Sequence, residues 1–263
     1  MYLREAHVEH DIPVLRTFIR ENPLGIFTTA IDCPPYPFLQ SSHIPWILDI
    51  SDDSSDTELG VLRGHMARAN PQSKAMMESL DKLGTTGPAT LERDVMILFN
   101  SPVHHYVTPK FYKATKGSTG KTVPTWNYAA VQVYGKATIY YQNDPATIAF
   151  LTVQGNDLSN LGEEKIMGHE EPWKVSDAPI RYIELLQKAI IGIEVKIESM
   201  GGKFKMSQEL PMGIGKTTTK LSEMVKERGQ LADAKKTKPK DVKESLHCKS
   251  LPSLFACILR FLK

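Results

Sequence analysis

Cysteine is scarce in this chain of 263 residues, and its three cysteines are not grouped. Cys33, Cys248 and Cys257 form no C-x-x-C pair and no metal-like cluster with histidine, which excludes a zinc ribbon or a disulfide scaffold. They are typical of free thiols in a reducing compartment. Residues 1–11 carry four charged side chains in place of the apolar run of a secretion signal. We therefore expect a cytoplasmic protein.

Motifs that bind DNA are also missing: the sequence holds no helix-turn-helix pattern, zinc-finger spacing or basic leucine zipper. Residues 1–215 carry 20 Lys and Arg against 25 Asp and Glu, a net charge of −5, which makes a poor surface for phosphate backbones. The basic excess lies in residues 216–263, with 12 against 5. Its Lys-rich stretch, residues 235–240, is typical of a solvated linker, with a nuclear address as the alternative.

Long apolar runs are missing as well. Residues 251–263 are mostly apolar, but Pro252 and Arg260 interrupt them, and they fall short of the roughly 20 residues needed to span a bilayer. We expect no membrane span. The segment is interpreted as an extension without a selected function, with an interfacial helix as the alternative.

Two motifs that suggest chemistry are incomplete. Residues 213–217 (Gly-Ile-Gly-Lys-Thr) resemble a phosphate-binding loop, but Leu210 stands where the first glycine is required. Side chains of the adjacent His104 and His105 point to opposite faces of a strand, and no Cys or carboxylate stands at ligand spacing, so we expect no metal. No Ser–His–Asp or Cys–His arrangement is legible, and we name no catalytic nucleophile.

Apolar and polar residues alternate over several stretches, which predicts half-buried strands with helices between them. We predict strands over residues 24–31, 38–49, 59–67, 95–99, 131–139 and 192–199, and helices over residues 12–21, 71–83, 144–159, 177–188 and 216–228. Helices do not alternate strictly with strands, so the sequence predicts a mainly β (α+β) domain over residues 1–215. Residues 216–263 are expected to form a separate, partly disordered tail with a basic helix or linker and an apolar end.

The stretch Leu62–Pro71 is the most informative part of the chain. A strand-like run ends in His65 and Arg68 and passes into Asn70-Pro71, which favours a helix start because Asn caps well and Pro is tolerated at the first position. The two basic side chains would then lie beside free backbone N–H groups at the positive end of a helix, a natural anion site. The alternative is an ordinary strand-to-helix corner with a solvated arginine.

A second segment has a similar density of polar groups. Val123–Tyr128 leads into a stretch whose period-two pattern predicts a half-buried strand. Trp126 and Asn127 stand just before that strand, where they can stack on and hydrogen-bond a flat ligand. The alternative is that Trp126 is a core aromatic at a strand entrance.

Nine blocks of sequence, taken in order, carry a family resemblance. They are Met1-Tyr2, Arg20–Pro23, Ser42–Pro45, Gly64–Pro71, Tyr106–Pro109, Val123–Tyr128, Glu171–Trp173, Ile190–Glu194 and Gly202–Gln208. Over residues 1 to about 210 the chain resembles the PaiB-type FMN-binding proteins, which are named as negative transcriptional regulators. The sequence departs from the family at Ser101 and Glu209, in a longer segment over residues 74–94, and after about residue 230.

The resemblance implies a split β-barrel of the flavin-reductase and pyridoxamine-phosphate-oxidase type. It further implies a homodimer with FMN in a groove between the subunits. Arg68, with His65 and Asn70 in support, is expected to hold the phosphate and ribityl end, because a guanidinium offers a planar pair of charged donors.

The isoalloxazine is expected to be hydrogen-bonded and stacked by His43, Trp126 and Asn127, some of them from the second subunit. Without the resemblance, His43 would be interpreted as an ordinary barrel histidine. Haem is an alternative ligand, since related split barrels use it and His43, His65 and His105 are available.

The sequence leaves three functions open. The first is an FMN-binding protein with a regulatory or redox role. The second is a flavin-dependent oxidoreductase or another enzyme acting on a small metabolite. The third is a DNA-binding repressor, to which the family name points and against which the acidic residues 1–215 argue.

Overall fold

The computed structural model describes residues 1–84, 86–111 and 123–206. These residues fall into two units: one holds Met1–His104 and the described residues from Trp126 onward, and the other holds the described residues from His105 to Thr125. In the second unit lie β8 (His105–Val107) and η1 (Pro109–Phe111). The predicted helix over 216–228 and the boundary after residue 215 lie outside the described residues.

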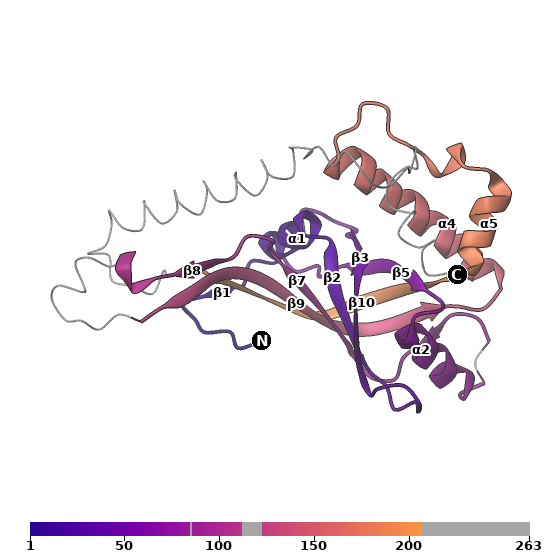
Figure 1. Cartoon of the computed structure of the whole chain (residues 1–263), viewed down its shortest axis with the longest axis horizontal. Coiled ribbons are helices and arrows are strands. Elements are labelled where there is room, and N and C mark those ends of the chain that lie inside the picture. The colour runs from indigo at the N-terminus through magenta and orange to yellow at the C-terminus, as the bar shows by residue number, and fades with distance from the viewer. Residues whose placement is uncertain (85, 112–122, 207–263) are drawn as a thin grey trace, which may run out of the picture. The chain divides into compact units, whose positions relative to one another are not determined.

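The first unit is built on one antiparallel sheet (Figure 1). In spatial order its strands are β3 (Leu39–Pro45), β2 (Leu24–Ala30), β7 (Val95–Asn100), β9 (Thr125–Tyr140), β10 (Ile190–Lys205), β5 (Val61–Ala67) and β4 (Ile47–Asp49). The short β1 (Val8–Glu9) pairs with β10, and β6 (Ala89–Thr90) pairs with β9. The sheet curls into the half-barrel expected of a split barrel, so the predicted mainly β fold with peripheral helices is confirmed.

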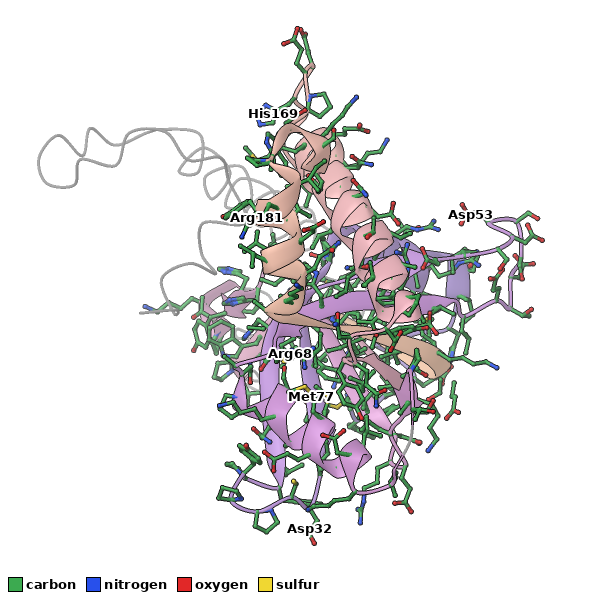
Figure 2. All side chains as sticks on the ribbon, turned by 90° about the vertical axis from the view of Figure 1, so that its right-hand side faces the viewer. Asp32, Asp53, Arg68, Met77, His169 and Arg181 are labelled. Carbon is green, nitrogen blue, oxygen red and sulfur yellow. The ribbon has the colours of Figure 1, made fainter. Side chains whose placement is uncertain are left out.

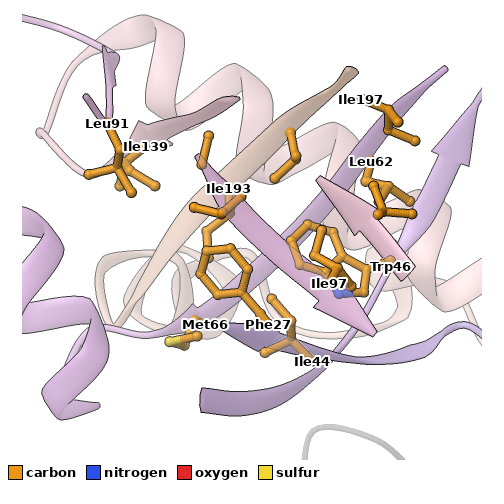
Figure 3. Close-up of a cluster of buried hydrophobic side chains, with 14 of the residues drawn as sticks. Phe27, Ile44, Trp46, Leu62, Met66, Leu91, Ile97, Ile139, Ile193 and Ile197 are labelled. Atoms are coloured by element: carbon orange, nitrogen blue, oxygen red, sulfur yellow. The ribbon is translucent and has the colours of Figure 1, made fainter. Parts of the chain in front are cut away.

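The core fills the inner face of the sheet because alternate residues of each strand point inward. On β5 the inward residues are Leu62, Gly64 and Met66. Trp46 lies at the centre, 1% exposed, with its ring in an edge contact 5.6 Å from that of Phe27 (Figure 3). A Cβ at Gly64 would approach the Trp46 ring to 3.0 Å, so this glycine makes room for the indole.

Polar caps start the longer helices where the sequence predicts them. α1 (Ile12–Glu21) follows Asp11, α2 (Pro71–Asp81) follows Asn70, and α4 (Pro145–Asn160) follows Asp144. Each cap side chain accepts from a backbone N–H of the first turn, as Asp144 does from Thr147 at 2.9 Å. α4 continues into the π-helical turn η2 (Leu161–Ile166), and η3 (Val175–Asp177) precedes α5 (Ile180–Lys188).

Helix α4 covers the outer face of the sheet over β4, β5 and β10, and α5 packs against α4 and β10 (Figure 1). Phe150 of α4 stacks on Tyr140 of β9, with ring centroids 4.0 Å apart and planes at 12°. A Cβ at Gly192 would lie 2.4 Å from the Phe150 ring. Gly192 therefore allows the helix to approach the sheet.

Three predicted strands differ from the structure in length. The strand predicted over residues 131–139 begins earlier, at Thr125, as β9. The run over 38–49 is divided into β3 and β4, because Trp46 turns into the core between them. The run over 192–199 extends to Lys205, since β9 supplies a hydrogen-bonded partner for it up to Tyr128. Long pairings of this kind depend on the neighbouring strand more than on local pattern.

Candidate functional site

Arg68 follows β5 directly, and its backbone N–H donates to Ala189 O at 2.8 Å. Its guanidinium donates to Lys188 O at 3.3 Å, to Met77 Sδ at 3.1 Å and to Tyr141 O (Figure 2). Within the described part of the chain no carboxylate lies within 4.0 Å of it. Burial lowers the pKa of Arg68 from its ordinary value, because nothing negative offsets the lost hydration. Arg68 is thus a partly buried cation without an ionic partner.

Arg68 lies between two adjoining pockets, which share the lining residues Arg68, Tyr141, Gln142 and Asn143. The first, of about 430 Å³, is completed by residues of α2: Lys74, Met77, Glu78 and Asp81. The second, of about 660 Å³, is completed by α4 and α5: Thr147, Ile148, Leu151, Glu184, Gln187 and Lys188. We call them the α2-side and α5-side pockets. Both fall in the size range of sites for small organic ligands.

The two pockets differ in charge. The α2-side pocket has two cations, Arg68 and Lys74, against two carboxylates. The α5-side pocket has two cations, Arg68 and Lys188, against the single carboxylate of Glu184. A multiply charged anion is therefore favoured electrostatically in the α5-side pocket.

Asn70 has both ends of its side chain occupied. Its Oδ1 accepts from Gln72 N at 2.8 Å as the cap of α2, and its Nδ2 donates to Ser42 Oγ at 3.0 Å. This second bond ties the start of α2 to β3, one residue before His43. His43 itself is exposed on β3, opposite Ile26 of β2.

His65 faces the side of β5 that α4 covers, opposite Gly192 of β10. Its Nδ1 is buried and has no hydrogen-bond partner among the described residues. Desolvation lowers the pKa of His65 to about 4. The imidazole is therefore neutral near pH 7 and supplies no positive charge to a phosphate.

Trp126 and Asn127 begin β9 at its other end. Trp126 is 52% exposed, with its ring 5.7 Å from that of His104, whereas Asn127 is 4% exposed. Strand register pairs Tyr140 of β9 with Gly192, the neighbour of His65, while Tyr128 pairs with Lys205. Asn127 stands thirteen positions before Tyr140, which corresponds to roughly 40 Å of strand. Within one chain, the tryptophan end and the arginine end of the sheet are far apart.

The sequence-predicted residues therefore form separate groups. Asn70 and Ser42 join α2 to β3 beside His43, and Arg68 stands between the pockets. His65 lies under α4, and Trp126 with Asn127 lies at the distant end of β9.

Residues that sequence reasoning missed come from distant parts of the chain. Lys188 and Gln187 line the α5-side pocket from α5, about 120 positions after Arg68, and no local pattern marks them. Arg63 was also missed: it donates to Asp49 of β4 and, at 2.7 Å, to Asp157 of α4. The regular alternation along β5 marks its face but not these partners.

The described ranges contain neither a metal-binding cluster nor a membrane-spanning helix. No group of three or more His, Cys, Asp and Glu could hold a metal ion there. No helix in those ranges is long and apolar enough to cross a membrane. His105, the first residue of β8, is buried, and His104 just before it is exposed, so one histidine faces inward and one outward as predicted.

Solved structures similar to this chain include the flavocytochrome Anf3 of Azotobacter vinelandii. It is 11% identical, with a TM-score of 0.43, and the match covers 78% of this chain and 72% of that one. A conserved hypothetical protein of Mycobacterium tuberculosis, Rv2991, is 10% identical with a TM-score of 0.43, covering 80% and 94%.

Three relatives in sequence cover between 79% and 89% of the chain. Uncharacterized proteins of Aspergillus fumigatus and Emericella nidulans are 54% and 51% identical over 261 and 252 residues; each match covers 89% of this chain and all of the relative. The protease synthase and sporulation protein PAI 2 of Bacillus subtilis is 26% identical over 215 residues, covering 79% of this chain and 82% of its own. The profile described as "Putative FMN-binding domain" matches residues 1–199. The predicted resemblance is therefore confirmed: the chain is PaiB-like and belongs to the FMN-binding domain family, with FMN as its cofactor.

Proposed function

We propose that the chain is a homodimeric flavoprotein with a redox role, which holds the FMN phosphate at Arg68. The observation that carries the proposal is that Arg68 is partly buried, lines a pocket and has no carboxylate partner in the described ranges. A bound anion would restore the interaction energy that the guanidinium lost with its water. Arg63, five residues earlier, has two carboxylates and offers no such gain.

The α5-side pocket suits the phosphate better than the α2-side pocket. A phosphate monoester carries close to two negative charges near neutral pH. Lys188 adds a second cation beside Arg68, and the amides of Asn143 and Gln187 add hydrogen-bond donors. Two carboxylates in the α2-side pocket would repel the same group. The residues present therefore fit the phosphate end of FMN.

The ring end leads us to propose the dimer. Arg68 and the pair Trp126–Asn127 lie at opposite ends of the sheet, much farther apart than the length of one FMN molecule. If Trp126 and Asn127 contact the ring, they belong to a second copy that binds in two-fold symmetry. An exposed face is available for this copy: Leu24, Leu39 and Tyr134 are 58%, 65% and 40% exposed.

A redox role is favoured over direct DNA binding. Bound FMN would supply transfer of one or two electrons. The chain would bind and orient it through Arg68, Lys188 and, from the second copy, Trp126. Residues 1–215 carry a net charge of −5, which disfavours repression by DNA contact. The regulatory function implied by the family name would then depend on the flavin or on a partner.

The experiment compares FMN with riboflavin, which lacks the phosphate. Arg68→Ala should weaken FMN binding about ten- to a hundredfold, the equivalent of a charged hydrogen bond worth about 1.5–3 kcal/mol. Riboflavin binding should change far less. Arg181→Ala is the matched control, because Arg181 is exposed on α5 and lines neither pocket. Equal losses for both ligands, or none for either, would place the phosphate elsewhere.

Redox role and assembly need their own measurements. Bleaching of the flavin by NADH or NADPH supports an oxidoreductase. A salt-dependent shift of random DNA by a chain lacking residues 216–263 would favour the repressor instead. Sedimentation of the flavin-loaded protein as a 29.4 kDa monomer would contradict the dimer.

A further inference from the structure

The α2-side pocket carries charges of both signs that do not neutralise one another. Arg68 and Lys74 supply the positive charges, and Glu78 and Asp81 supply the negative ones. No ion pair within 4.0 Å joins any of these four side chains to another charged group in the described part of the chain. Lys74 and Glu78 stand four residues apart on one helix, the spacing at which such pairs usually form.

The two carboxylates are held in place by neutral donors. Tyr36 Oη donates to Glu78 Oε1 at 2.7 Å, and Tyr141 Oη donates to Asp81 Oδ1 at 2.8 Å. Cys33 Sγ also approaches Glu78 Oε2 to 3.8 Å as a weak donor. Both carboxylates keep further acceptor positions, because each carboxylate oxygen can accept more than one hydrogen bond. Glu78 and Asp81, three residues apart, also share a face of α2. They form a fixed acceptor pair at one side of the pocket.

The lining also includes apolar surface. Tyr141 is 5% exposed, and Met77 is partly buried against the core. Thioether side chains adapt their shape to apolar ligand groups. A volume of about 430 Å³ is at the small end of the range for ligand sites, so the occupant is a small metabolite.

We propose that this pocket binds a small zwitterion of the α-amino-acid type with an apolar side chain. The carboxylate of the ligand lies against Arg68 and Lys74, its ammonium against Glu78 and Asp81, and its side chain against Met77 and Tyr141. A simple anion would be repelled by the two carboxylates, and a simple cation by the two basic groups. A zwitterion satisfies both pairs.

This site adjoins the α5-side pocket proposed for the FMN phosphate, and the two share Arg68, Tyr141, Gln142 and Asn143. An amino acid bound here would share Arg68 with the flavin phosphate and so couple the two ligands. The site itself does not depend on FMN, because Glu78, Asp81 and Lys74 do not line the α5-side pocket.

The test uses three probes of one shape in calorimetric titrations of the purified full chain at low salt. L-leucine is the zwitterion; 4-methylpentanoate lacks its ammonium group, and 3-methylbutylamine lacks its carboxylate. Leucine should bind at least about tenfold more tightly than either single-charge probe, since each loses one set of charged hydrogen bonds. Equal binding of leucine and 4-methylpentanoate, or no leucine binding at its highest soluble concentration, would overturn the proposal.

Two variants locate the binding. Glu78→Gln and Asp81→Asn remove a charge but keep an oxygen that accepts from Tyr36 or Tyr141. Each should weaken leucine about tenfold or more and leave FMN content unchanged. Glu164→Gln, an exposed carboxylate of η2, is the matched control and should change neither. Full leucine affinity in both pocket variants would contradict the site.

FMN content is measured on the same samples by flavin release on denaturation. Leucine selectivity in a chain that retains no FMN would support the zwitterion site and contradict the flavin proposal. A chain that retains FMN but does not prefer leucine would support the flavin proposal and contradict the zwitterion site.

Discussion

Arg63 within β5 and Arg68 directly after it show how position determines the role of one residue type. Arg63 donates to Asp49 at 2.8 Å and to Asp157 at 2.7 Å, so it joins β5 to β4 and to α4. These carboxylates hold the pKa of Arg63 above its ordinary value. Arg68 meets two carbonyl oxygens and a thioether, and burial lowers the pKa of its guanidinium. Similar side chains thus have opposite electrostatic surroundings.

The difference has an energetic meaning. Desolvation of a charge costs free energy that only a partner can offset. Arg63 recovers this cost within the folded chain, whereas Arg68 recovers little of it. An arginine of the first kind stabilises the fold, and one of the second kind gains from an external anion. The following measurements test this contrast, beginning with the largest expected effect.

His65 lies between the two arginines in the sequence, and its burial makes the stability of the fold depend on pH. Its pKa is about 4 in the folded chain against 6.5 ordinarily, so the unfolded chain binds the proton first as pH falls. The free energy of unfolding should have its full value above pH 6.5. It should fall as the pH drops towards 4, by as much as about 3 kcal/mol. Urea unfolding of His65→Gln across this range should lose that slope. His10→Gln, at an exposed histidine, should keep it.

Arg63→Met should lower the free energy of unfolding by about 2 kcal/mol. This value lies between those for exposed and buried pairs, because the Arg63 side chain is 13% exposed and its two partners about 40%. Arg20→Met is the matched control: its pair with Asp53 is exposed, so the loss should stay below about 1 kcal/mol. Equal losses of the two variants in urea unfolding would show that the partly buried pairs of Arg63 stabilise the fold no more than an exposed pair does.

Arg68→Met should act through the ligand. FMN at about one hundred times its wild-type Kd should stabilise the wild-type chain by about 2.7 kcal/mol, and a variant that binds tenfold more weakly by about 1.4 kcal/mol. The variant without FMN loses hydrogen bonds to two carbonyl oxygens and a thioether but no ion pair, and it no longer buries a charge. Its loss should therefore stay below about 2 kcal/mol, the value expected for Arg63→Met. A large loss without FMN, and no change in the FMN effect, would make Arg68 a structural residue like Arg63.

Removal of residues 235–263 should have the smallest effect. The segment has no alternating pattern to join the sheet, so unfolding and FMN content should both stay as in the full chain. Loss of soluble protein on this truncation would show that the tail packs against the rest. In that case, the surroundings of Arg63 and Arg68 could not be described from residues 1–206 alone.

What the sequence determined by itself is local. Asn70-Pro71 and Asp144-Pro145 start helices because the cap and its N–H partner stand within three residues of each other. The period-two pattern identifies the inner face of β5 and the central part of β9, since a strand repeats every two residues. Nine ordered blocks were enough to identify the family.

Only the tertiary structure decided what surrounds each functional side chain. Arg63 and Arg68 stand five positions apart, yet one meets Asp157, 94 positions away, and the other meets Lys188, 120 positions away. The long pairing of β9 with β10 places Trp126 and Asn127 far from Arg68, although both segments carry signs of one ligand. Charge neutralisation and pocket formation depend on groups brought together by folding, and no local pattern encodes them.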